Sequence, residues 1–112
     1  MAQVFDEREL NIIVNDYISK LKGKISIDKV ILFGSYATGK ATELSDIDLL
    51  IVSKDLSEDE PKGANGYYLD TLVGEFNPNL EVIAVHPAKL DHPVNKDFFE
   101  EVVNTGKFFT LK

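Results

Sequence analysis

Residues 30–52 read VILFGSYATGKATELSDIDLLIV, and this stretch decides how the chain folds. It holds two nearly continuous apolar runs, which are separated by a polar segment with two glycines and no proline. Apolar runs of this length are typical of strands that are covered on both faces. The stretch therefore predicts two buried strands, at residues 27–33 and 47–52, joined by a turn and a short helix.

Residues with distinctive chemistry lie at the ends of these two strands. Gly34 and Ser35 follow the first strand, and Asp46 and Asp48 open the second after ten intervening residues. Strand side chains two apart share a face, so the two carboxylates lie about 7 Å apart along the backbone and can hold magnesium or manganese. Gly34 lets a phosphate approach the backbone, and a helix starting at Ser35 would offer free amides. Either half alone can be an ordinary turn or loop, but together they indicate metal-assisted nucleotidyl transfer.

The rest of the chain supplies helices and one more core strand around this pair. Helical spacing of apolar residues predicts a helix over 6–22, with Asp6 and Glu9 as a capping box and Gly23 at its end. We expect a flexible loop at 53–65, a helix over 68–76 and a strand at 80–85. A connector at 87–93, a helix stopped by Gly106 and a short edge strand at 108–111 complete the order. This order predicts an α/β (α+β) fold, a small mixed β-sheet packed against helices.

Composition limits the classes of protein that the chain can belong to. Its 112 residues predict a single domain over 1–112, and 44% apolar residues are enough for one core. The chain has no cysteine and no apolar run near the roughly 20 residues that span a membrane, which fits a cytoplasmic protein. A formal net charge of −7 disfavours nucleic acid as a partner and suits a basic protein.

Residues 30–52 closely resemble the signature of the minimal nucleotidyltransferases, within the polymerase-beta-like nucleotidyltransferase superfamily. Gly34-Ser35, ten residues and Asp46-x-Asp48 match the family's glycine-serine and double-aspartate motif without insertion. The resemblance implies a nucleotidyltransferase fold, with helices on one side of a small mixed sheet. It implies that Asp46 and Asp48 hold two magnesium ions and that Gly34 and Ser35 hold the phosphates of the nucleotide. It also implies a third carboxylate on a later strand, which helps to bind a metal and activates the attacking hydroxyl.

Glu81 is the candidate for that third carboxylate, because it is an acid within the apolar segment LEVIAV. A buried carboxylate is costly without a partner, and a metal would supply one. The alternative is that Glu81 begins an edge strand and faces water. The family usually has aspartate there. Glutamate is one methylene longer, so the sequence does not decide whether its carboxylate reaches the metal in the same way. Asp70 and Glu75 are weaker candidates.

Several other residues have a structural role as the alternative to a functional one. Many relatives carry an arginine two or four residues after the motif glycine, where this chain has Tyr36 and Thr38. Lys40 or Lys54 would have to meet the triphosphate instead, unless each is a plain surface lysine. We interpret both histidines, both tyrosines before the second long helix and the four phenylalanines near the end as structural. If half of these phenylalanines are exposed, they mark a partner surface. The residues in question are His86, His92, Tyr67, Tyr68, Phe98, Phe99, Phe108 and Phe109.

The small size of the chain bears on its acceptor. Larger relatives carry a second domain for the acceptor, and a chain of this size resembles the antitoxin of a toxin–antitoxin pair whose partner is an all-helical HEPN-domain protein. The resemblance implies Mg²⁺-dependent transfer of AMP from ATP to a tyrosine hydroxyl of that partner. The alternative is a non-catalytic module that neutralises its partner by binding, which Glu81 and the missing arginines favour. End modification of nucleic acid is disfavoured by the charge.

Overall fold

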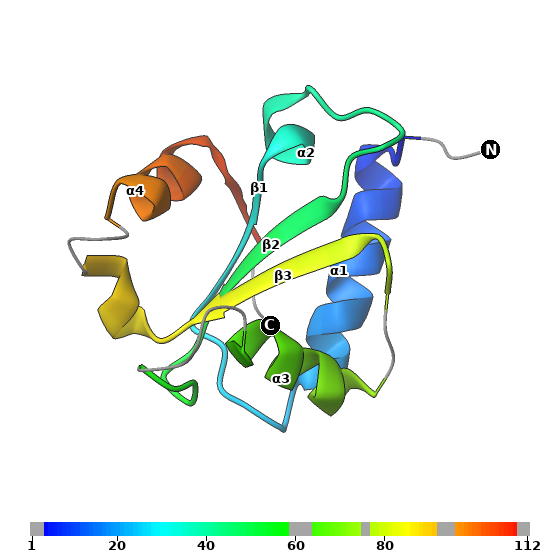
Figure 1. Ribbon diagram of the computed structural model, residues 1–112. Coiled ribbons are helices and arrows are strands. Elements are labelled where there is room, and N and C mark those ends of the chain that lie inside the picture. The colour runs from blue at the N-terminus through cyan, green and yellow to red at the C-terminus, as the bar shows by residue number, and fades with distance from the viewer. Residues whose placement is uncertain (1–3, 59–63, 75–76, 92–95, 110–112) are drawn as a thin grey trace.

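The structure is a computed structural model that describes residues 4–58, 64–74, 77–91 and 96–109 (Figure 1). Within these ranges, no helix is long and apolar enough to cross a membrane. The elements in chain order are α1 (Glu7–Leu21), β1 (Lys29–Phe33), α2 (Ser35–Thr38), β2 (Ile47–Val52), α3 (Ala64–Val73), β3 (Leu80–Val85), the 3-10 helix η1 (Pro87–Asp91), α4 (Lys96–Thr105) and β4 (Lys107–Phe108).

The strands form one mixed sheet in the order β3-β2-β1-β4. β1 runs antiparallel to β2 and to β4, whereas β2 and β3 are parallel. The predicted α+β class and the small mixed sheet are confirmed. The expected edge strand near the C-terminus is β4, which pairs with β1, while residues 110–112 lie outside the described residues.

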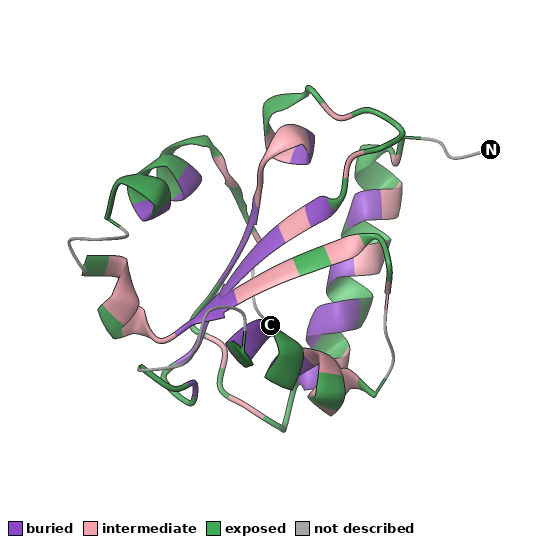
Figure 2. Ribbon diagram, viewed as in Figure 1, coloured by how far each residue is buried: buried purple, intermediate pink, exposed green. Residues whose placement is uncertain are grey.

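Helices cover both faces of the sheet (Figures 1 and 2). α1 and α3 bury one face, where Val14 and Leu69 pack with alternate residues of the strands. On the other face, Phe99 and Val102 of α4 cover Ile31 of β1, together with Leu50, Val52 and Val85. The expectation of helices on one side only was wrong for this chain. The reason is that the second face of the sheet is also apolar, and α4 removes it from water.

The helix boundaries follow the predicted caps at α1 and depart from the prediction at α3. The capping box is present, because the Glu9 amide donates to Asp6 Oδ1 at 2.8 Å and the Asp6 amide donates to Glu9 Oε1 at 3.1 Å. α3 begins at Ala64, so the polar loop after β2 is shorter than expected. Asn65 and Gly66 are buried in its first turn, and a Cβ on Gly66 would lie 2.4 Å from the Val82 carbonyl oxygen. The close packing of α3 on β3 therefore requires small or polar residues at the start of the helix, which the pattern of apolar residues does not reveal.

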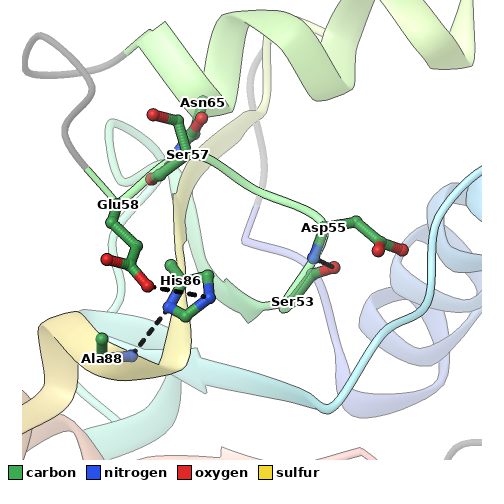
Figure 3. A network of polar contacts seen from close by, with 7 residues as sticks. All are labelled: Ser53, Asp55, Ser57, Glu58, Asn65, His86 and Ala88. Carbon is green, nitrogen blue, oxygen red and sulfur yellow. Dashed lines mark hydrogen bonds and ion pairs between the residues drawn. The ribbon is translucent and has the colours of Figure 1, made fainter.

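A polar network joins the loop after β2 to the end of β3 (Figure 3). His86 Nδ1 accepts a hydrogen bond from the Ala88 amide at 3.0 Å, and its Nε2 lies 3.4 Å from Glu58 Oε1. Ser53 is fully buried, and its hydroxyl oxygen accepts from the Asp55 amide at 3.1 Å. His86 thus links the loop after β2 to the segment that follows β3, at the end of the sheet away from Asp48. His92 lies outside the described residues.

Candidate active site

The two halves of the glycine-serine and double-aspartate motif touch at Gly34 and Asp48. Gly34 has a φ of +74°, in the region that favours glycine. A Cβ placed on it would lie 2.3 Å from Asp48 Oδ2 and 3.3 Å from Asp48 Cγ. No other residue fits there without displacing the carboxylate. The turn after β1 is therefore pressed against the carboxylate of β2.

α2 begins at Ser35, where the sequence suggested a short helix. The Thr38 amide donates to the Gly34 carbonyl at 3.2 Å, which closes the turn. Tyr36 is 7% exposed and packs in the core, and its hydroxyl oxygen accepts from the Phe5 amide at 3.3 Å. The residue just before the N-cap of α1 therefore anchors the turn that carries Ser35.

The acidic residues meet across neighbouring strands. Asp48 is partly buried on β2, and the parallel register places Glu81 of β3 directly beside it. Burial raises the pKa of Asp48 to about 6, and the charge of Glu81, a hydrogen bond to it and the charge of Asp46 add to this effect. The carboxyl groups of Asp48 and Glu81 are thus neighbours across β2 and β3, and each disfavours the charge of the other.

Asp46 stands slightly apart from that pair. It is exposed and precedes the first residue of β2, and its effect on the pKa of Asp48 is the smallest of the causes. Over the described ranges, no three His, Cys, Asp or Glu side chains are gathered in a group that could hold a metal ion. The donors nevertheless fit magnesium, because they are hard oxygens and their crowded negative charge is of the kind that a divalent cation neutralises.

Glu81 combines features of both of its predicted alternatives. β3 is an edge strand and the side chain is exposed, as the water-facing alternative required. It also contacts Asp48, as a metal-site carboxylate would. Its assignment as a ligand and base therefore stays a prediction, now with a geometry that permits it.

The other candidate residues lie away from Asp48 and Glu81 or have structural partners. Asp70 accepts from the Tyr17 hydroxyl at 2.8 Å, and burial together with this hydrogen bond raises the pKa of Tyr17. Lys54 follows β2 at the end opposite Asp48, and Glu75 lies outside the described residues. A shallow hollow on α1 contains none of the motif residues and is lined by Glu7, Arg8, Asn11, Ile12 and Asn15.

An aromatic pair beside the acids was missed from the sequence. Phe33 pairs with Asp48 between β1 and β2, and the Phe98 ring lies 5.8 Å from the Phe33 ring. Phe98 is 41% exposed and Phe108 is 53% exposed, whereas Phe99 is buried. Two of the four phenylalanines near the end are therefore exposed, which is the proportion that we expected of a partner surface. The position of Phe33, directly before Gly34, was the available signal.

Comparison with known proteins places the chain in a family. The family model for the nucleotidyltransferase domain matches residues 13–104, and the chain belongs to this family. Two proteins of Methanocaldococcus jannaschii, each described as a "putative protein adenylyltransferase", are similar to it. One is 53% identical over 105 residues, which cover 91% of this chain and 95% of the relative. The other is 38% identical over 90 residues, which cover 76% of this chain and only 60% of the relative.

Solved structures share the fold. A structure described as a "putative nucleotidyltransferase" from Sulfolobus solfataricus has a TM-score of 0.63 at 21% identity, and the match covers 91% of this chain and 79% of that one. A structure described as a toxin-antitoxin with AMP-PNP has a TM-score of 0.53 at 22% identity, covering 84% of this chain and 69% of that one. The family predicted from residues 30–52 is thus confirmed, with the nucleotidyltransferase fold.

Proposed function

We propose that the protein transfers AMP from ATP to a hydroxyl group, that of a tyrosine, on a partner protein. The observation that carries the proposal is the contact between Gly34 and Asp48, where a Cβ on the glycine would lie 2.3 Å from the carboxylate. This contact supports the proposal, because it brings the turn that we expect to receive phosphate next to the acid that we expect to bind magnesium. The description of two relatives as protein adenylyltransferases supports a protein as the acceptor.

The motif residues divide into two roles. Gly34 and Ser35 hold the phosphates of ATP, through backbone that no side chain obstructs and through the serine hydroxyl. Asp46, Asp48 and Glu81 hold magnesium, for which we propose two ions. Magnesium held by these three carboxylates would neutralise the triphosphate and polarise the α-phosphate.

The transfer step then follows from the position of Glu81. A tyrosine hydroxyl has an ordinary pKa of about 10 and is protonated at neutral pH, so its attack needs a base. The tyrosine oxygen forms a bond to the α-phosphorus while its proton passes to the Glu81 carboxylate. The bond between the α-phosphorus and the oxygen that bridges to the β-phosphate breaks, and pyrophosphate leaves with that electron pair.

We further propose that the partner is a helical HEPN-domain toxin and that the modification silences it. The fold shared with a toxin-antitoxin structure that holds AMP-PNP supports this class of partner. The formal net charge of −7 favours a basic partner surface.

The test is the mass of the partner after incubation. The product of the adjacent open reading frame, mixed with this protein, ATP and magnesium, should gain the mass of AMP on a tyrosine. Asp48→Asn should abolish the gain and Glu81→Gln should slow it by about 100-fold or more. Asp28→Asn, which removes an exposed acid before β1, should leave it intact. An unmodified partner in the presence of the unaltered protein would refute the proposal.

A second candidate is a module that neutralises its partner by binding alone. The exposure of Glu81 and the burial of Tyr36, where many relatives carry arginine, favour it. Calorimetry separates the two functions. Tight partner binding without magnesium-dependent ATP binding would identify occlusion.

A further inference from the structure

An aromatic pair borders the proposed nucleotide site on the face of the sheet that carries the acids. Phe33 ends β1 and is registered opposite Asp48, so the two side chains leave the sheet on one face with Cβ atoms about 5 Å apart. Phe98 lies in the first turn of α4 and packs against Phe33. The ring centroids are 5.8 Å apart and the ring planes are 89° apart.

Phe98 is not needed to close the core under α4. Phe99 and Val102 already anchor this helix on the sheet, and they are 6% and 2% exposed. Phe98 keeps 41% of its surface in water, between the exposed acids Asp97 and Glu100. An apolar ring left exposed beside a polar site is available to a ligand.

Two perpendicular rings form a corner that suits a flat ligand. A planar group that stacks on the face of one ring turns its own edge toward the face of the other, and both arrangements are favourable for aromatic pairs. Stacking of a nucleobase on an aromatic side chain contributes about 1–3 kcal/mol and does not depend on charge.

Charge alone offers this protein little affinity for a nucleotide. The formal net charge is −7, and the residues that follow Gly34 and Ser35, from Tyr36 to Gly39, carry no charge. Arg8, the one arginine in the chain, lies on α1. A contact with the nucleobase would therefore add to the affinity for a nucleoside triphosphate.

We propose that Phe98, supported by Phe33, stacks against the nucleobase of the nucleoside triphosphate whose phosphates lie at Gly34 and Asp48. This inference rests on the proposed function, and it adds the subsite for the base. The substrate class is then a complete nucleoside triphosphate rather than any polyphosphate.

Fluorescence tests the contact directly, because the chain contains no tryptophan. Phe98→Trp introduces a single tryptophan, whose fluorescence Mg-ATP should quench and Mg-tripolyphosphate should not. Tyr67→Trp is the matched control, because Tyr67 is 73% exposed on α3, which packs on the opposite face of the sheet. Its fluorescence should not respond to either ligand. Equal quenching of both tryptophans would overturn the assignment.

Calorimetry tests whether the aromatic ring contributes to affinity. Phe98→Leu keeps an apolar side chain without a ring and should weaken Mg-ATP binding by roughly ten-fold. Phe98→Tyr keeps the ring and should bind Mg-ATP like the unaltered protein. Binding of Mg-tripolyphosphate should be equal in all three proteins, and matching melting temperatures show that each is folded.

The outcomes separate the inference from the function on which it rests. If the unaltered protein neither binds Mg-ATP nor adds AMP to its partner, the proposed function fails and the base subsite fails with it. If the unaltered protein does both and Phe98→Leu binds Mg-ATP equally well, only the base subsite is refuted. Loss of partner binding in that variant would then assign Phe98 to the protein interface.

Discussion

Replacement of Asp48 by asparagine should make the protein more stable while it destroys the site. Asp48 is ionised at neutral pH although burial, Glu81 and Asp46 all favour its protonated form and raise its pKa from 3.8 to about 6. One pKa unit corresponds to about 1.4 kcal/mol, so the ceiling on the cost of this charge is about 3 kcal/mol. Because the side chain is still partly exposed, solvent screening reduces the cost, and we expect a gain of about 1 kcal/mol for Asp48→Asn.

The sign of the pH dependence follows from the raised pKa. Below pH 3.8 the folded and unfolded chains both protonate Asp48, so the variant and the unaltered protein should be equally stable. The native charge cost develops between that pH and about 6, and it is fully present above it. The stability advantage of Asp48→Asn should therefore appear as the pH rises through this window.

Denaturant unfolding in the presence of a chelator measures the difference. A gain of about 1 kcal/mol should raise the melting temperature by about 4 °C. Magnesium at ten times its dissociation constant should stabilise the unaltered protein by about 1.4 kcal/mol and the variant by less, so the advantage should shrink or reverse. Asp28→Asn makes the same change of net charge away from the acids and should show neither effect. A variant that is less stable than the unaltered protein in chelator at pH 7 would refute the reasoning.

Further substitutions at Gly34, Glu81 and Tyr36 test the contact with the carboxylate, the proposed base and the anchor of the turn. Gly34→Ala should lower the free energy of unfolding by at least about 2 kcal/mol and abolish AMP transfer, because the added Cβ meets the Asp48 carboxylate in a backbone conformation that is nearly confined to glycine. Gly39→Ala is the comparison, because Gly39 also has a positive φ but lies in the left-handed α region with nothing within 4 Å of its Cβ, so it should cost less and keep transfer. Glu81→Gln should slow transfer by about 100-fold or more in a radiolabel assay, and Glu81→Asp should retain measurable transfer; equal rates would remove Glu81 from the role of base. Tyr36→Phe should lose about 1 kcal/mol in denaturant unfolding by removing the acceptor for the Phe5 amide, and an unchanged stability would show that this hydrogen bond does not hold the turn.

The sequence predicted those parts of the fold that leave a local pattern. β1, β2 and β3 appear as apolar runs, and the capping box of α1 appears as Asp6 followed by Glu9. The start of α3 was missed because Asn65 and Gly66 are buried there for their small size and hydrogen bonding. Apolar periodicity does not register such residues.

The arrangement of the site depends on strand order, which no single segment encodes. Gly34 and Asp48 were predicted to act together from their spacing, and their contact is consistent with that. Glu81 was selected only as an acid in an apolar strand, and it meets Asp48 because β3 pairs in parallel with β2. The contact of Phe98 with Phe33 required α4 to cover the acid-bearing face, whereas the resemblance had implied helices on one side of the sheet only.

Asp48 also bears on how β2 finds its place in the sheet. After Asp48, β2 is buried on both faces, so its apolar pattern would tolerate a shift of one residue. Such a shift would turn Asp48 toward α1 and α3, where an ionised carboxylate among Val14 and Leu69 would be strongly unfavourable. In the native register the carboxylate instead lies against Gly34 and Glu81 at the edge of the core. The acid that destabilises the native site by repulsion therefore destabilises the shifted register more. The residue that we propose as a metal ligand thus also favours the strand pairing that assembles the site.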